Sequence, residues 1–382
     1  MIKNYMPTYS RNALKYIPTG DDDLAQAFRE CFLMARRGKI DTMDEHRFEL
    51  GSPEDLKQLT AEVITRNYSP ADGKAFITYH PVIREIFAAP FRDRVIHHFL
   101  YAVNGFWWDN QFIYDSYSCR MNKGTLFGIK RTQHFMNKAT EGGSKEAMII
   151  KLDISGYFMS MPRTVLYRKV LDGLEKQFPR HGWLYDTCVY LWYEIIFDNP
   201  IDGVRLAGNK HNWDDLPANK SLFNQPDLQG IVIGNLTSQL LSNILLNELD
   251  HKMKFKYEIP FYGRYVDDMI MVVPAEDFSR VFRIISNEVP IELAKLGLKL
   301  HPQKMYIQSV EKGVPFLGQF VHQYYTTPSK RIKGNYYRTA KEVMMGLKNP
   351  DAIISYHGMG KHTSQKKLEA KIFAEMGWEY NW

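Results

Sequence analysis

The stretch FYGRYVDDMIM, residues 261–271, sets two adjacent aspartates, Asp267 and Asp268, between aromatic and aliphatic residues. The flanking residues favour β-strands, so the stretch predicts a hairpin whose tip carries both carboxylates. Burying a charge is costly unless something offsets it. Successive side chains of a strand point to opposite faces, so we expect the pair to act together with a third group.

A second apolar stretch supplies a candidate for that third group. Residues 147–154, AMIIKLDI, form a nearly all-apolar run that predicts a strand buried on both faces, with Asp153 at its end. Three carboxylates repel one another, and divalent cations would neutralise them. Oxygen ligands favour Mg²⁺ or Mn²⁺ over zinc, and two such ions about 3.5–4 Å apart support in-line phosphoryl transfer. For the Asp pair alone the alternative is a polar turn, because aspartate is common in turns.

The composition indicates a folded protein with a polyanionic partner. A chain of 382 residues that is 45% hydrophobic can bury at least one large core, and its length favours two or three lobes. The net charge of +6 favours a partner such as nucleic acid. Cys31, Cys119 and Cys188 are far apart and odd in number, which favours a reducing, cytoplasmic setting. The N-terminal residues 1–16 lack a signal-peptide core, and no run is long and apolar enough to span a membrane, so no membrane partner is expected.

Local patterns predict the other elements. An acidic first turn and helical spacing of apolar residues predict an amphipathic helix at 21–37. Residues 198–230 are rich in Asn, Asp, Pro and Gly without a clear period, which predicts a long loop insertion. The further expectations are two extended segments at 75–87 joined by a turn at Pro81, helical periodicity at 163–197, a turn and long helix at 230–253, a helix at 277–296, and a pair of short strands at 298–308 and 314–322.

Together these motifs resemble the reverse transcriptase family. YVDD at 265–268 matches the YxDD signature of the family's palm, and KLDISGYF at 151–158 matches the upstream palm motif that supplies the third aspartate. The resemblance runs from about residue 75 to 325. It implies an α+β fold of the right-hand polymerase type, with fingers, a palm built on an antiparallel sheet with the YVDD hairpin, and a small helical thumb. The implied domains are an N-terminal helical extension (1–74), fingers (75–145), a palm with inserted fingers elements and the loop insertion (146–318), and a thumb (319–382).

The resemblance also implies a nucleotide site. The fingers motifs at 84–98 and 116–125 would supply Arg84 and Arg120 as phosphate contacts, because arginine forks match phosphate oxygens; the alternative for each is a solvated charge. Phe158 would be the aromatic gate that excludes a ribose 2′-hydroxyl, and its alternative is a plain core aromatic. Gly234 and Gln239 would line the same site.

Further roles follow from the resemblance. The carbonyl of Ile154 would join Asp153, Asp267 and Asp268 as a metal ligand, and Lys304 would assist the pyrophosphate leaving group. The implied contacts to template and primer are Tyr265, the primer-grip residues Phe316 and Gly318, and Lys330, Arg331 and Lys333 of the basic stretch 329–338.

IGNLTSQ at 233–239 indicates the branch of the family. Most reverse transcriptases carry QGxxxSP here, whereas this chain has Ile233 for Gln and Gln239 for Pro. This form resembles the reverse transcriptases of diversity-generating retroelements, bacterial and phage systems that copy a template RNA with frequent errors at adenines. Val266, where that group often has Met, and the long insertion depart from the pattern. The alternative is an antiphage defence enzyme that works with a non-coding RNA, with protein-primed or repetitive DNA synthesis.

The implied function is that of an RNA-directed DNA polymerase using dNTPs and two Mg²⁺ or Mn²⁺ ions. Its expected partners are an RNA template, the RNA/DNA hybrid, and further a non-coding RNA with a small accessory protein or a second reverse transcriptase. Two other hypotheses stay open: a non-catalytic RNA-binding protein that keeps a polymerase fold, against which the acidic triad argues, and polymerisation that is template-independent or primed from a tyrosine. No RNase H domain is expected.

Overall fold

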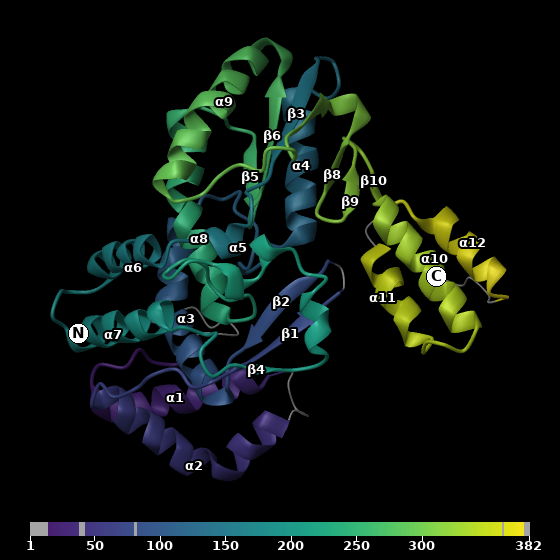
Figure 1. Cartoon of the computed structure of the whole chain (residues 1–382). Helices are drawn as coiled ribbons and strands as arrows, with labels where there is room; N and C mark the ends of the chain where they lie inside the picture. The colour runs from purple at the N-terminus through teal and green to yellow at the C-terminus, as the bar shows by residue number, and fades with distance from the viewer. Residues whose placement is uncertain (1–13, 38–42, 80–81, 361–362, 378–382) are drawn as a thin grey trace. The chain divides into compact units, whose positions relative to one another are not determined.

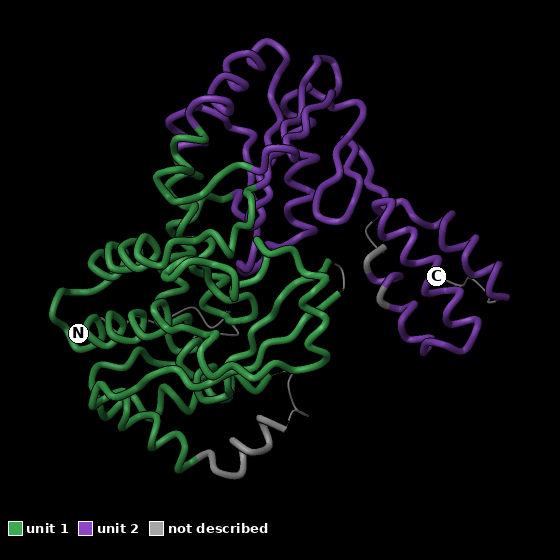
Figure 2. Tube along the Cα trace, in the orientation of Figure 1, with its two compact units in different colours: residues 1–114, 154–251, 289–300 green, residues 115–153, 252–288, 301–382 purple. Residues whose placement is uncertain are grey.

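The computed structural model describes residues 14–37, 43–79, 82–360 and 363–377 (Figure 1). The predicted turn at Pro81 and most of the N-terminal stretch lie outside the described residues. The chain forms two compact units (Figure 2). Unit 1 comprises residues 1–114, 154–251 and 289–300, and unit 2 comprises residues 115–153, 252–288 and 301–382. The predicted boundaries of fingers, palm and thumb stay predictions.

The elements of unit 1 are mainly helical. They are α1 (Asp21–Arg36), α2 (Met43–Ile64), β1 (Lys74–Thr78), β2 (Arg84–Ala88), α3 (Phe91–Gln111), α5 (Tyr157–Ser160), α6 (Arg163–Gln177), α7 (Trp183–Phe197), β4 (Arg205–Leu206), the 3₁₀ helices η1 (Lys210–Trp213), η2 (Ala218–Lys220) and η3 (Leu222–Asn224), and α8 (Leu236–His251). Helix α3 packs against α1 and α8. The helices expected at 21–37 and 163–197 and the turn and helix at 230–253 are confirmed.

The elements of unit 2 are helices and the strands of two antiparallel sheets, one four-stranded and one three-stranded. They are α4 (Thr125–Ala139), β3 (Ala147–Leu152), the π-helix η4 (Lys252–Lys256), β5 (Tyr262–Tyr265), β6 (Asp268–Pro274), η5 (Ala275–Asp277), β7 (Tyr306–Ser309), η6 (Val310–Lys312), β8 (Val314–Phe316), β9 (Gln319–Val321), β10 (Thr326–Pro328), α10 (Lys330–Met344), α11 (Asp351–Gly360) and α12 (Lys366–Glu375). Helix α9 (Phe278–Lys295), close to the expected bounds, contributes residues to both units.

The four-stranded sheet of unit 2 has the order β5-β6-β3-β7, with every pair antiparallel. Strand β3 lies between β6 and β7, which explains why residues 147–152 are nearly all apolar. Tyr265 pairs with Asp268, so Val266 and Asp267 form the two-residue tip of the β5–β6 hairpin, and Val266 has a positive φ of 57°. The predicted hairpin on an antiparallel sheet is therefore confirmed.

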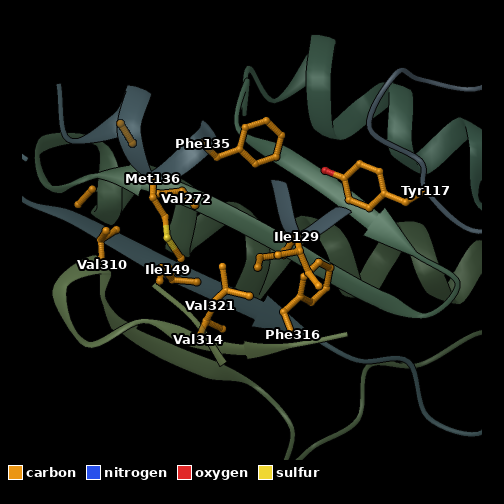
Figure 3. Close-up of a cluster of buried hydrophobic side chains, with 13 residues drawn as sticks. Tyr117, Ile129, Phe135, Met136, Ile149, Val272, Val310, Val314, Phe316 and Val321 are labelled. Atoms are coloured by element: carbon orange, nitrogen blue, oxygen red, sulfur yellow. The ribbon is translucent and has the colours of Figure 1, made fainter. Parts of the chain in front are cut away.

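The core of unit 2 forms between this sheet, α4 and the β8–β9 hairpin (Figure 3). Ile149 and Val272 of the sheet lie in one cluster with Ile129 and Phe135 of α4 and with Val314 of β8. Each side chain of this size contributes roughly 1.5–3 kcal/mol when it is fully removed from water. The cluster therefore holds the strands that carry Asp153 and the YVDD hairpin in a fixed arrangement.

The strand pairing around 298–322 differs from the prediction. Strand β7 pairs with β3, and β8 pairs with β9 rather than with β7. The reason is a tight turn after Phe316, where Leu317 and Gly318 both have positive φ, so that Phe316 pairs directly with Gln319.

The predicted loop insertion at 198–230 contains regular elements. Strand β4 adds in parallel to β1, which pairs antiparallel with β2, so the sheet order is β2-β1-β4. Three short 3₁₀ helices follow β4. No local period predicts them, because Trp213 of η1 and Leu222 of η3 pack with residues far away along the chain, such as Ala75 and Phe87.

The C-terminal helices α10–α12 enclose a small core of their own, which includes Tyr336, Ile353 and Phe373. Helix α10 begins where Ser329 caps it by accepting a hydrogen bond from the Ile332 amide at 3.3 Å. Among the described residues, no helix is long and apolar enough to cross a membrane.

Candidate active site

Asp153 and Asp268 meet where β3 and β6 run side by side in unit 2. Leu152 pairs with Met269, so the residue that follows β3 lies beside the first residue of β6. Each carboxylate contacts a lysine. Lys304 Nζ lies 3.0 Å from Asp153 Oδ1, and Lys151 Nζ lies 3.3 Å from Asp268 Oδ1. The backbone of Asp153 is also held in place, because the His301 amide donates to the Asp153 carbonyl at 2.8 Å.

The pKa of Asp268 reflects its burial and the charged groups around it. Burial raises the pKa of the Asp268 carboxyl above its usual range, and the neighbouring Asp153 raises it further, while Lys151 and Lys304 oppose the rise. The ammonium groups thus compensate part of the negative charge that the two strands gather. A site with this property attracts cations.

A buried arginine, Arg264, hydrogen-bonds to the backbone of the hairpin tip. Arg264 is 0% exposed, and its Nη1 donates to the Val266 carbonyl at 2.7 Å. Its backbone amide donates to the Asp115 carbonyl at 2.9 Å, and the Asp115 carboxylate pairs with Arg131 and Lys254. These contacts make the turn that carries Asp267 rigid. A buried arginine two residues before the turn was not foreseen.

The predicted ligand set does not form a ready-made cluster. Within residues 14–37, 43–79, 82–360 and 363–377, no group of three or more His, Cys, Asp or Glu side chains is disposed to hold a metal ion. Asp153 and Asp268 are brought together with lysines, whereas Asp267 occupies the turn of the hairpin. The donors nevertheless suit a hard divalent cation, since they are carboxylate oxygens whose present partners are exchangeable ammonium groups. Ile154, the predicted carbonyl ligand, is buried and belongs to unit 1.

Most of the predicted nucleotide-binding residues lie in unit 1. Arg84 is exposed at the start of β2, and Phe158 is partly buried in an apolar cluster with Phe87 and Ile233. Gly234 has a φ of 136° and lies so close to the Phe87 carbonyl that a Cβ there would overlap it. The structure thus brings β2, the Phe158 turn and the first half of IGNLTSQ together.

Two further candidates are Gln239 and Arg120. Gln239 is exposed in the first turn of α8, and its carbonyl accepts a hydrogen bond from Ser242 Oγ at 2.8 Å. Arg120 belongs to unit 2 and donates through Nη1 to the Ser116 carbonyl at 3.0 Å.

The start of α8 is fixed by a buried histidine. His97 of α3 lies 2.8 Å, through Nδ1, from the Thr237 hydroxyl of IGNLTSQ. Burial lowers the pKa of His97 to about 3, and the charges of His98 and Arg94 act in the same direction. The imidazole is therefore neutral at physiological pH.

The predicted template and primer residues divide into two groups. The exposed or partly exposed ones are Tyr265, Gly318, Lys330, Arg331 and Lys333, with the three basic residues in the first turn of α10. Phe316 is the exception among these residues, and its predicted contact with primer stays a prediction. Phe316 is 1% exposed and packs in the core with Val314 and Val321, because β-strand alternation turns it inward.

Lys151 is a site residue that sequence reasoning missed. It is two residues before Asp153, which directly follows β3, and in an extended chain side chains at that spacing share a face. The spacing of Lys151 and Asp153 in AMIIKLDI, residues 147–154, therefore indicates Lys151 as a site residue.

The strand-end carboxylates and the YVDD turn on an antiparallel sheet define an α+β polymerase fold of the right-hand type. The chain belongs to the family described as reverse transcriptase (RNA-dependent DNA polymerase), which matches residues 83–321. This family consists of RNA-directed DNA polymerases, a class of nucleotidyltransferase that generally uses divalent metal ions. No curated protein matches the chain.

Solved structures similar to this chain include two telomerases. One is apo telomerase from Candida tropicalis truncated from its C-terminal domain, with a TM-score of 0.48 and 14% identity, over 71% of this chain and 59% of that one. Another is telomerase from Candida albicans in complex with a fragment of telomeric RNA, with a TM-score of 0.48 and 12% identity, over 82% of this chain and 57% of that one. The match thus spans less than two thirds of either telomerase chain.

Proposed function

We propose that this protein is an RNA-directed DNA polymerase that copies a dedicated RNA template into cDNA, in a bacterial or phage retroelement of the diversity-generating type. One observation carries the polymerase activity: in a chain of this family, β3 and β6 bring Asp153 and Asp268 together beside the rigid turn that carries Asp267.

In this proposal the three aspartates, with the Ile154 carbonyl, would hold two Mg²⁺ or Mn²⁺ ions. Held there, such ions would supply the positive charge that favours ionisation of the attacking primer hydroxyl and offsets the charge of the leaving pyrophosphate. Lys304, which lies 3.0 Å from Asp153, would turn its ammonium group toward the pyrophosphate oxygens and donate hydrogen bonds to them. Lys151 would keep Asp268 oriented toward the ligand side of the hairpin.

The remaining residues would hold the substrates. Arg84 and Arg120 would bind phosphates, Phe158 would exclude a 2′-hydroxyl, and Gly234 with Gln239 would contact the nascent base pair. Template and primer would contact Tyr265, Gly318 and the basic start of α10. We assign fingers, palm and thumb to residues 75–145, 146–318 and 319–382, and RNA template with RNA/DNA hybrid as the partner.

The activity is tested by primer extension on an RNA template with dNTPs and Mg²⁺. The change of both Asp267→Ala and Asp268→Ala should abolish DNA synthesis. The matched control is Glu276→Ala, which removes an exposed carboxylate from η5 and should retain activity. DNA synthesis retained by the double aspartate variant refutes the assignment.

The diversity-generating type rests on Ile233 and Gln239. Replacing the rigid proline of the common motif by glutamine could loosen the pocket that senses the base pair, and the exposed position of Gln239 is compatible with a contact there. An Ile233→Gln, Gln239→Pro variant should make fewer errors opposite adenine than the natural chain. Equal error spectra in a misincorporation assay argue against this branch.

A defence role is the second candidate, because Val266 at the hairpin tip and the insertion at 198–230 depart from the pattern of the diversity-generating group. Sequencing the RNA that co-purifies with the protein, together with the cDNA made from it, separates the two. Adenine-mutagenised cDNA supports diversification. Short or repetitive cDNA, with a non-coding RNA and an accessory protein or second reverse transcriptase in the complex, supports defence.

A further inference from the structure

The insertion at residues 198–230 is anchored to β2 by one buried carboxylate. Glu85 is 0% exposed. Its Oε1 accepts hydrogen bonds from Trp213 Nε1 at 2.7 Å and from Ser221 Oγ at 2.9 Å, and its Oε2 accepts one from the Leu222 amide at 2.6 Å. A buried carboxylate is costly unless its oxygens are hydrogen-bonded, and these three donors all belong to the insertion. Folding of the insertion against β2 is therefore coupled to the charge of Glu85.

The same contacts fix which face of β2 presents Arg84. Glu85 and Phe87 are buried and face the insertion, where the Phe87 ring lies 5.9 Å from the Phe223 ring. Arg84 and Ile86 lie on the opposite face, and Arg84 is exposed. A slip of one residue would bury the arginine in place of Glu85, so the insertion specifies the register of the strand.

The insertion also holds the turn that carries Phe158. The Ile231 amide donates to the Phe158 carbonyl at 2.9 Å, and the Gly230 amide donates to the Met161 carbonyl at 2.8 Å. Leu222 packs in one apolar cluster with Met159 and Phe158. One residue, Leu222, therefore contacts both the carboxylate of Glu85 and the Phe158 turn.

We infer that the insertion sets the position of Arg84 relative to Phe158, with Glu85 as the positioning residue, and that it thereby controls affinity for the incoming nucleotide and discrimination against ribonucleotides. This inference rests on the proposed function, which assigns Arg84 to the triphosphate and Phe158 to the sugar. Glu85 itself faces away from Arg84 and acts through the strand.

The test compares Glu85→Gln and Trp213→Phe with the natural chain in single-nucleotide extension. Glutamine keeps the size of the side chain but turns an acceptor into a donor that faces other donors, and phenylalanine removes one donor. Either variant should raise the KM for dNTP about tenfold and lower the preference for dNTP over rNTP about tenfold, while kcat changes less than about threefold. The control is Tyr79→Phe. It removes the exposed hydrogen bond from the Tyr79 hydroxyl, just after β1, to Asp215 of the insertion, and it should leave the KM for dNTP and the preference for dNTP over rNTP unchanged.

A second measurement separates this inference from the polymerase assignment. Hydrogen exchange at the amides of 84–88 and 156–161 should rise together in either variant that folds, whether or not the protein synthesises DNA. Exchange that rises in one segment only overturns the coupling. With an active natural chain, unchanged KM and unchanged sugar preference in the variants, or a lower kcat alone, overturn the positioning role. An inactive natural chain refutes the proposed function and leaves the exchange result to decide the coupling.

Discussion

Two lysines decide the charge at the candidate active site. Lys151 of β3 contacts Asp268 of β6, and Lys304 contacts Asp153 from the segment before β7. Each carboxylate is thus paired with the lysine of a neighbouring segment. Such cross-strand pairs orient the two carboxylates and offset part of their mutual repulsion.

At the residue scale, Lys304→Met should lower kcat for nucleotide addition roughly 10²–10⁴-fold, because a positioned donor to the leaving group contributes about that much. The KM for dNTP should change much less, since the contact strengthens as pyrophosphate charge develops. Lys312→Met removes an exposed lysine of unit 2 and serves as the control. Steady-state primer extension gives both constants, and a variant in which only KM rises contradicts a role in the chemical step.

The sequence predicted the aspartates but not every side chain around them, because the burial of those side chains depends on packing between distant segments. Asp153, Asp267 and Asp268 are recognisable because carboxylates beside apolar strands are costly and therefore informative. The FLG motif specifies a backbone turn but not the burial of the Phe316 side chain, because its inward orientation depends on the partner strand. Arg264 reads as an ordinary charged residue until the packing around β5 buries it.

At the element scale, the start of α8 depends on the neutral state of His97. The folded pKa of about 3 lies below the usual 6.5, so the contribution of His97 to stability is present above about pH 6.5 and is lost as pH falls toward 3. At pH 5 the loss is about 2 kcal/mol. His97→Gln keeps a neutral polar group near Thr237 and removes this dependence.

Urea unfolding at pH 7.5 and at pH 5.0 measures that effect. Between these two pH values the natural chain should lose about 2 kcal/mol more than the His97→Gln variant. Other titrating groups are common to both proteins, so their contributions cancel in the comparison. An equal loss in both proteins would mean that the imidazole already accepts a proton in the fold at pH 5.

Gly234 brings the motif IGNLTSQ, residues 233–239, into close contact with β2. Gly234 has a φ of 136°, and a Cβ there would overlap the Phe87 carbonyl. Gly234→Ala should therefore lower the free energy of unfolding by about 2 kcal/mol or more. Gly334→Ala is the matched control, because its Cβ would meet nothing within 4 Å inside α10 and alanine favours helix by about 0.5–1 kcal/mol. The urea midpoints of both variants measure these changes, and a Gly234→Ala protein as stable as the natural chain contradicts the predicted strain.

The elements that sequence reasoning missed are those defined by distant partners. The β5–β6 hairpin is predictable because its strands and turn are adjacent in the chain. The 3₁₀ helices η1 and η3 of the insertion are bonded to Glu85, more than 120 residues away, and β7 depends on pairing with β3 rather than with its neighbour. Local periodicity carries no signal for such contacts.

At the scale of the whole molecule, the net charge of +6 predicts salt-dependent binding of nucleic acid. Lys330, Arg331 and Lys333 lie in the first turn of α10, where Lys330 and Arg331 are exposed and Lys333 is partly exposed, whereas Tyr336, one turn further on, packs in the helical core. In the proposed function they track the phosphate backbone of an RNA/DNA hybrid. Each phosphate contact releases condensed counterions on binding, so affinity should fall steeply with salt.

Replacing these three basic residues by glutamine should weaken binding of an RNA/DNA hybrid and make the plot of log affinity against log salt shallower by about 2–3, because each lost phosphate contact contributes about one unit of slope. Lys57, Lys176 and Lys220, all exposed in unit 1, can be changed to glutamine as a control with the same loss of net charge. Fluorescence anisotropy at several salt concentrations gives both slopes. Equal slopes for the two triple variants would show that overall charge, rather than the start of α10, attracts the hybrid. A shallower slope for the α10 variant alone assigns the phosphate contacts to that helix.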